Sequence, residues 1–137
     1  MVGLVIVTHS SLGGALIEAA ESILAEPLGT VTAVSVDLRQ SAEHLRKKIS
    51  AGIKEVDQGG GILILTDMFG GTPSNLSLSF LEEGRIEVLT GVNLPLVIRA
   101  AKMRKDKDLS ELAVDLQAYG RKSISLASGV LKGNKRT

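Results

Sequence analysis

The sequence predicts an α/β protein with a mostly parallel central sheet and helices on both faces. Short apolar runs alternate along the chain with longer stretches in which apolar residues recur at helical spacing. The runs at 2–7 and 61–66 are apolar at almost every position, which is typical of strands that are covered on both faces. Strands that are separated by helices of this length pair in parallel, because a helical crossover returns the chain to the same end of the sheet.

Strands are expected where apolar or β-branched residues run together between turn residues. The segment at 31–36 is rich in valine and threonine, and the glycines at 59–61 lead into the next run. A short segment at 123–126 follows the last expected helix and is a candidate for a final strand. The expected strands are therefore 2–7, 31–36, 61–66, 86–89 and 123–126.

Helices are expected where a capping residue precedes a stripe of apolar residues. Ser10 or Ser11 can cap the first helix, and Ser41 opens the second. Thr72 suits a cap, and Pro73 suits the first helical position because its missing N–H would be unpaired there anyway. The expected helices are 11–25, 41–56, 72–83, 96–102 and 109–121.

Length and charge limit the function of the chain. With 137 residues, it is expected to form one domain over 1–137 that is large enough to bury a core. The net charge of +1 gives no electrostatic footprint for DNA or RNA, and 2% aromatic residues offer few platforms on which bases could stack. We therefore expect no nucleic-acid partner.

The absence of cysteine removes disulfides, thiolate metal sites and cysteine nucleophiles. It fits a reducing cytoplasm, and the sequence shows neither a basic signal segment nor an apolar run long enough to span a bilayer. The two histidines lie far apart along the chain, so a zinc site is not expected. We expect a cytoplasmic protein without a metal or another cofactor.

Polar residues follow two of the expected strands at the point where each strand ends. His9 ends the first apolar run, and Asp67 ends the run at 61–66. The carboxyl ends of neighbouring parallel strands share one edge of the sheet, where ligands bind. A carboxylate there can hold one imidazole nitrogen and leave the other nucleophilic. We therefore expect His9 and Asp67 to meet and to handle a phosphoryl group.

A glycine-rich helix start follows Asp67 and supplies the third part of this predicted site. Gly70 and Gly71 let the backbone approach a ligand closely, and the hydroxyls of Thr72 and Ser74 add hydrogen-bond donors. The N–H groups at a helix start attract anions. The predicted phosphoryl-binding residues are therefore Gly70, Gly71, Thr72 and Ser74.

Each of these signals also has an interpretation without function. A lone histidine at a strand end can be inert, an aspartate there can be a turn residue, and a double glycine is often only a tight turn. The segment lacks the Walker loop pattern, and no GxGxxG motif follows the first strand, so nucleotide binding is not supported. His44 lies among basic residues and is expected at the surface.

The chain resembles the IIA domains of the mannose/fructose/sorbose family of the sugar phosphotransferase system. The likeness rests on the stretches at 5–10, 65–75 and 90–95, which read VIVTHS, LTDMFGGTPSN and TGVNLP. It implies that His9 is the phosphorylated histidine and that Asp67 hydrogen-bonds its Nδ1, so that the phosphoryl group sits on Nε2. It also implies that the loop at Gly71 and Thr72 holds the phosphoryl group.

The resemblance further implies the partners. The phosphoryl group would come from phosphorylated HPr and go to a IIB component, expected on a separate protein, and a permease would provide the indirect link to the membrane. A homodimer is implied as well, with 123–126 as an antiparallel edge strand on the partner's sheet. Two alternatives stay open, namely a regulatory phosphocarrier without a permease and the phosphoryl-donor subunit of a dihydroxyacetone kinase.

Overall fold

A parallel sheet in the strand order β2-β1-β3-β4 forms the centre of the protein. The structure is a computed structural model, and it describes residues 1–133, so the last four residues of the expected domain 1–137 lie outside the description. The strands are β1 (Gly3–His9), β2 (Val31–Val36), β3 (Ile62–Thr66) and β4 (Ile86–Thr90). The helices are α1 (Leu12–Leu24), α2 (Ala42–Val56), α3 (Thr72–Leu78), α4 (Leu94–Met103), α5 (Leu109–Lys122) and α6 (Ala127–Gly133).

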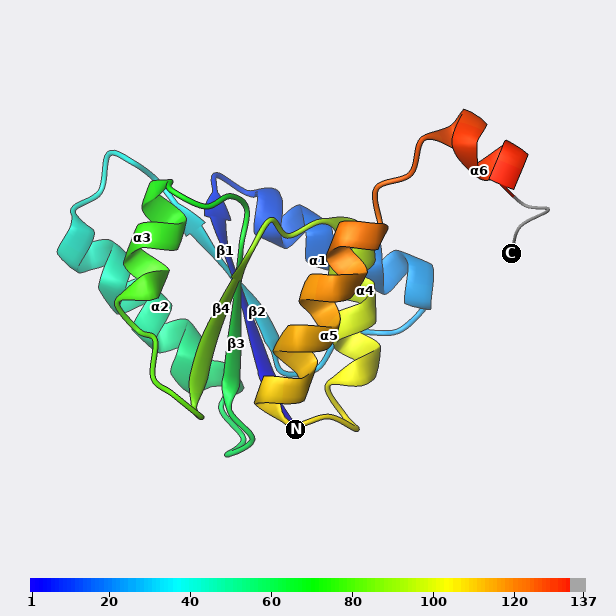
Figure 1. Cartoon of the computed structure of the whole chain (residues 1–137). Helices are drawn as coiled ribbons and strands as arrows, with labels where there is room; N and C mark the ends of the chain where they lie inside the picture. Colours follow the sequence, from blue (N-terminus) through cyan, green and yellow to red (C-terminus); the bar gives the residue numbers. More distant parts are fainter. Residues whose placement is uncertain (134–137) are drawn as a thin grey trace.

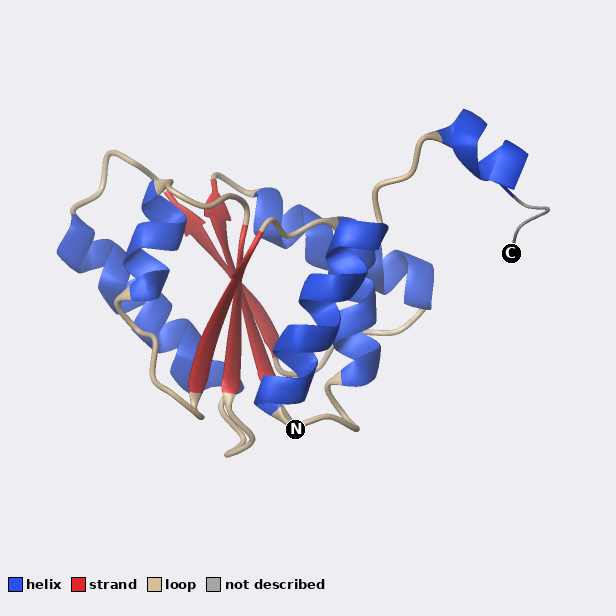
Figure 2. Ribbon diagram, viewed as in Figure 1, coloured by secondary structure: helices blue, strands red, loops and turns tan. Residues whose placement is uncertain are grey.

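Helices cover both faces of this sheet (Figures 1 and 2). On one face, Leu4 and Ile6 of β1 belong to a core that α1, α4 and α5 complete. On the other face, Val5 and Val7 pack in a second core with residues of α2 and α3. Alternate residues of β1 therefore enter two different cores, which explains why the whole run is apolar. The predicted fold class, a parallel α/β sheet with helices on both faces, is confirmed.

The order of the strands creates a switch point between β1 and β3. After β1 the chain pairs β2 on one side of it, and it then crosses to pair β3 on the other side. The loops that leave the carboxyl ends of β1 and β3 therefore start in opposite directions and open a crevice, which is where open α/β sheets bind ligands. His9 lies at this end of β1, and Thr66 ends β3.

The helix that follows β3 is shorter than predicted. α3 ends at Leu78 rather than near residue 83, and its N-cap is Gly71 rather than Thr72. Ser77 donates its hydroxyl to the Pro73 carbonyl, and Ser79 donates to the Leu76 carbonyl. Such side-chain bonds compete with the helical ladder. Tight turns then lead into β4.

Two other helix starts also differ from the prediction. α4 begins at Leu94, not at residue 96, because Asn93 accepts the Leu96 N–H through its side chain and caps the helix. Ser11 is the N-cap of α1, but its side chain makes no capping bond. By contrast, Ser41 caps α2 as predicted, by accepting the N–H of His44.

The segment after α5 does not form the expected strand. Residues 123–126 lie outside the sheet, and α6 projects away from the rest of the molecule (Figure 1). Ile124 and Leu126 are 83% and 79% exposed, so their apolar side chains have no cover in the single chain. The single chain therefore shows no antiparallel edge strand, and the pairing of 123–126 with the sheet of a second copy stays a prediction.

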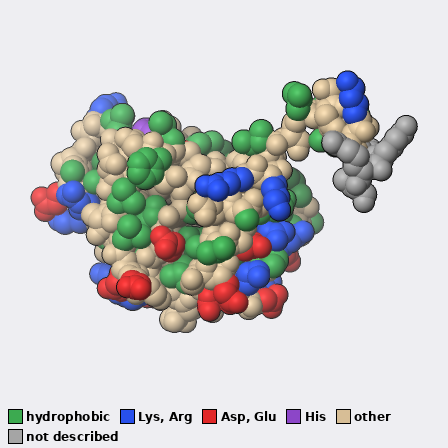
Figure 3. Space-filling view, in the orientation of Figure 1, with side chains coloured by type: hydrophobic (Ala, Val, Ile, Leu, Met, Phe, Trp, Pro, Cys, Tyr) green, Lys and Arg blue, Asp and Glu red, His purple; other side chains and the backbone are tan. Residues whose placement is uncertain are grey.

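The described residues include no helix that is both long enough and apolar enough to cross a membrane. Acidic and basic side chains are interspersed over the face in Figure 3, without a large area of one sign.

Candidate functional site

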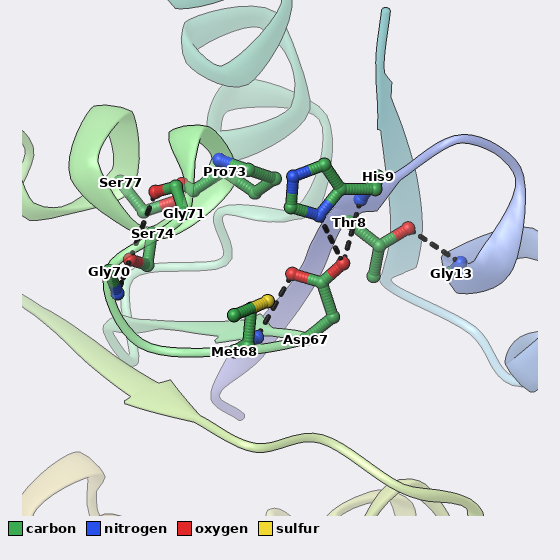
Figure 4. A network of polar contacts seen from close by, with 10 residues as sticks. All are labelled: Thr8, His9, Gly13, Asp67, Met68, Gly70, Gly71, Pro73, Ser74 and Ser77. Atoms are coloured by element: carbon green, nitrogen blue, oxygen red, sulfur yellow. Dashed lines mark hydrogen bonds and ion pairs between the residues drawn. The ribbon is translucent and has the colours of Figure 1, made fainter.

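The site centres on a direct contact between His9 and Asp67 (Figure 4). His9 ends β1, and Asp67 directly follows β3, its neighbour in the sheet. The Oδ2 atom of Asp67 lies 2.8 Å from Nδ1 of the His9 ring and accepts the His9 backbone N–H at 2.9 Å. One carboxylate oxygen thus holds both the main chain and the ring of the histidine. The two residues meet as predicted.

The carboxylate of Asp67 is itself held in place. Its other oxygen, Oδ1, accepts the backbone N–H of Met68 at 3.0 Å. Partial burial acts to raise the pKa of Asp67, but the hydrogen bonds from the His9 backbone and ring outweigh it and lower the pKa below its ordinary value. Asp67 is therefore ionised at neutral pH and favours the tautomer in which Nδ1 of His9 carries the proton.

The other ring nitrogen of His9 remains open. Nε2 makes no hydrogen bond to any residue that the structure describes, and the His9 side chain is 36% exposed. With the proton on Nδ1, the lone pair of Nε2 is available to an electrophile. The geometry therefore presents the oriented Nε2 atom of the ring at the switch point of the sheet.

Gly71 packs against the edge of this ring. A Cβ atom added at Gly71 would lie 2.9 Å from Cε1 and 3.5 Å from Nε2 of His9. The first distance is closer than carbon atoms normally approach one another. Glycine is therefore needed here for close approach, whereas Gly70 has a φ of +91° and is needed for its backbone conformation.

Ser74 stabilises the loop that carries these two glycines. Its hydroxyl accepts the N–H of Gly70 at 3.0 Å and donates to the carbonyl of Gly71 at 3.2 Å, and the side chain is fully buried. The hydroxyl is thus engaged inside the loop. Thr72 is the first residue of α3 and is half-buried, and its hydroxyl has no hydrogen-bond partner in the part of the chain that is described.

The third motif, at 90–95, is hydrogen-bonded to the end of β3, next to the site. The N–H groups of Gly91 and Val92 both donate to the carbonyl of Thr66 at 2.9 Å. Asn93 caps α4 and also donates to the hydroxyl of Ser123 at 3.0 Å. The bonds from Gly91 and Val92 tie the loop after β4 to Thr66, the residue that precedes Asp67, and those of Asn93 tie the same loop to α4 and to the end of α5.

Thr8 is a supporting residue that the sequence did not identify. It is fully buried, and its hydroxyl accepts the N–H of Gly13 at 2.9 Å (Figure 4). This bond does the capping that Ser10 or Ser11 was expected to do, so α1 starts against the residue that precedes His9. Ser10 has a φ of +50° in the tight turn between them. The available signal in the sequence was a threonine at the end of the apolar run, directly before the histidine.

His44 lies apart from the site. It is exposed on α2, as the sequence predicted. Within residues 1–133, no group of three or more His, Cys, Asp or Glu side chains is placed to hold a metal ion.

The chain also matches a family of known proteins. The model of the EIIA-man family, described as the PTS system fructose IIA component, matches residues 3–117. The chain belongs to this phosphotransferase-system IIA family. The predicted resemblance is thereby confirmed, and with it a general role in the phosphoryl transfer of sugar transport.

Individual relatives agree with the assignment to the IIA family. The chain is 30% identical over 129 residues to the fructose-specific EIIA component of Bacillus subtilis. This alignment covers 93% of this chain and 88% of that protein. It is 31% identical over 130 residues to the mannose-specific EIIAB component of Escherichia coli K12, covering 90% of this chain but only 39% of that protein. This IIA protein therefore spans well under half of the Escherichia coli relative.

A solved structure extends the likeness to three dimensions. The EIIA component from Streptococcus agalactiae superposes with a TM-score of 0.80 at 26% identity, and the match covers 93% of this chain and 98% of that one. A mannose/sorbose-specific IIA subunit from Enterococcus faecalis shares the fold, with a TM-score of 0.80 at 24% identity. The alternative of a dihydroxyacetone kinase subunit is not favoured by these findings.

Proposed function

We propose that this IIA protein is a phosphohistidine carrier. It accepts a phosphoryl group from phosphorylated HPr on Nε2 of His9 and passes the group to a histidine of a IIB component, in the cytoplasm. The observation that carries the proposal is the 2.8 Å contact between Nδ1 of His9 and Asp67, with Nε2 left open at the switch point of the sheet.

The roles of the residues follow from this contact. The lone pair of Nε2 attacks phosphorus while the bond from phosphorus to the donor's histidine nitrogen breaks, and the donor imidazole leaves with that electron pair. The proton on Nδ1 of His9 stays in place. The ring therefore gains positive charge, which the Asp67 carboxylate at 2.8 Å stabilises. Passing the group on to IIB reverses these changes at His9.

The loop at 70–74 would hold the phosphoryl group. Phosphoryl transfer passes through a loose transition state, so the protein mainly positions the group and supplies donors. Gly71 lies against the edge of the ring at Cε1, next to Nε2, and the Thr72 hydroxyl is available to donate. Gly70 and Ser74 hold the loop through their mutual hydrogen bond, so we assign them a positioning role.

Labelling by the donor system tests this proposal. Incubation with phosphoenolpyruvate, Enzyme I and HPr should add one acid-labile, base-stable phosphoryl group to the chain, measured by intact-mass spectrometry. The His9→Ala variant should gain none. The His44→Ala variant is the matched control, because His44 is exposed and remote in sequence, and it should label fully. Full labelling of His9→Ala would overturn the assignment of His9.

We also propose a homodimer that the C-terminal segment completes. The exposed apolar side chains of Ile124 and Leu126 are 83% and 79% uncovered in the single chain. β4 lies at the edge of the sheet, and within residues 1–133 its outer side carries only an isolated antiparallel bridge between Ile86 and Glu82, so the rest of that edge is free. Pairing of 123–126 with that edge in a second copy would cover the side chains and satisfy open backbone groups.

Transport is favoured over the regulatory alternative by the names of the relatives, which are sugar-specific components for fructose, mannose and sorbose. Sugar uptake in cells that lack this protein tests the distinction. A loss of phosphorylated sugar on deletion supports transport, whereas unchanged uptake with altered gene expression supports regulation.

A further inference from the structure

A cavity beside His9 contains a charged pair that the predicted site does not include. The cavity has a volume of about 390 Å³. His9 and Ser10 line it from the end of β1, and Asp37, Leu38 and Arg39 line it from the loop between β2 and α2.

The sheet fixes this loop next to the histidine. His9 lies opposite Val36 in the pairing of β1 with β2, and the N–H of Ser10 donates to the Val36 carbonyl at 3.2 Å. Asp37 directly follows Val36, so the loop begins one strand spacing, about 5 Å, from the His9 backbone. The position of Arg39 is therefore tied to the same strand ends that build the site.

Asp37 holds Arg39 in a defined place. The guanidinium donates from Nε to Oδ1 at 3.0 Å and from Nη2 to Oδ2 at 2.9 Å, and Oδ1 also accepts the Arg39 backbone N–H at 3.0 Å. The side-chain bonds from Arg39 lower the pKa of Asp37 to about 2, so the carboxylate stays ionised. The Arg39 side chain is 90% exposed, and its guanidinium is thus held as a two-point fork, with Nη1 making no hydrogen bond within residues 1–133.

A cation near His9 would stabilise a phosphoryl group there, in addition to the donors of the loop at 70–74. Asp67 and Asp37 are both anionic, and a phosphoryl group brings further negative charge. Arg39 is the one cation among the described residues that line the cavity. Arginine is well suited to phosphate because its planar fork donates several hydrogen bonds at once.

We propose that Arg39, anchored by Asp37, is the cation that binds the phosphoryl group on His9. This inference rests on the proposed function. In the free protein Asp37 neutralises the guanidinium and keeps it beside the cavity. When the phosphoryl group arrives, the unused N–H groups of Arg39 bind it and mask the negative charge of Asp37.

The test compares the wild type with three variants: Arg39→Gln, Asp37→Asn and the double variant. Arg39→Gln should slow transfer from phosphorylated HPr about tenfold, because it removes a charge-assisted bond and unmasks Asp37. The double variant should recover part of this loss, because it also removes the repelling carboxylate. Arg46→Gln, an exposed arginine of α2 that does not line the cavity, is the matched control and should match the wild type.

A second readout separates phosphoryl binding from a merely structural role. In the phosphorylated chain, ³¹P NMR follows the second ionisation of the phosphoryl group with pH. A nearby cation favours the dianion, so the pKa of the phosphoryl group should be higher in Arg39→Gln than in the wild type and in Arg46→Gln. An unchanged titration, even with weaker binding of HPr, would overturn the proposal, because Arg39 would then act on the partner protein.

The two proposals fail differently. If the wild type takes up no phosphoryl group, the proposed function and the role of Arg39 are both overturned. If the wild type is labelled on His9 but Arg39→Gln has the same transfer rate and the same titration, only the role of Arg39 is overturned.

Discussion

Gly71→Ala is the substitution whose effect can be worked out most directly from the structure. The added Cβ would lie 2.9 Å from Cε1 of His9, whereas carbon atoms in contact are normally about 3.5–4.0 Å apart. The ring must therefore move by about 0.6 Å or more. Nδ1 lies 2.8 Å from Asp67, and N–H···O bonds are normally about 2.7–3.2 Å long, so a shift of this size can weaken the contact that orients the ring.

The expected result is a chain that folds but transfers slowly. A misplacement of about 1 Å can cost about 100-fold in rate, so we expect transfer from phosphorylated HPr to fall by about 10- to 100-fold. The crowded ring should also lower the free energy of unfolding by about 1–3 kcal/mol. Rapid mixing with phosphorylated HPr, followed by quenching and intact-mass detection, measures the transfer rate. Urea unfolding measures the free energy of unfolding.

Gly14→Ala is the matched control for this experiment. A Cβ at Gly14 meets no atom within 4 Å, and the residue lies inside α1, close in sequence to His9. The control should gain about 0.4–1 kcal/mol of stability and transfer at the wild-type rate. Wild-type transfer by Gly71→Ala, with an unchanged His9 ring signal in NMR spectra, would refute the contact between Gly71 and the ring as a determinant of rate.

The other predictions concern Asp67 and the C-terminal segment. Asp67→Asn should slow transfer by about 10²–10⁴ in the same assay, because the amide no longer stabilises a charged ring, and an unchanged rate would make the carboxylate purely structural. Because the pKa of Asp67 is lowered in the folded chain, its carboxylate stabilises the fold above the carboxyl's ordinary pKa of 3.8, and this stability is lost as pH falls through the lowered value. The free energy of unfolding in urea should therefore depend less on pH between about pH 5 and pH 2 in Asp67→Asn than in the wild type. Truncation after Lys122 should convert a dimer into a monomer in light scattering, and a truncated chain that stays dimeric would refute the exchanged-strand arrangement.

Much of the fold follows from patterns that are local in sequence. The runs that became β1 and β3 are apolar on both faces, and that pattern is typical of a buried parallel strand. The meeting of His9 and Asp67 was predictable for the same reason, because both follow strands whose carboxyl ends share an edge. Whether those two strands are neighbours depends on the sheet order, and here β1 and β3 do pair.

Features that depend on long-range partners were not predictable. The segment at 123–126 has the composition of a strand, but a strand exists only when another backbone pairs with it. Arg39 was missed because its place beside His9 depends on the pairing of β1 with β2, which brings the loop after Val36 to the site. The early end of α3 was missed for a different reason. It is accompanied by local bonds from serine hydroxyls to the backbone, which leave no mark in hydrophobic periodicity.

His9 and the aspartate that orients its ring are synthesised at different times. His9 and Asp67 are 58 positions apart, and ribosomes add about 5–20 residues per second, so several seconds separate their appearance. In that interval the imidazole has no carboxylate to select its tautomer. A nascent or truncated chain that ends before β3 would therefore be a poor acceptor and would not drain phosphoryl groups from the donor pool. Under the proposed function, labelling of His9 would report that β3 has docked on β1.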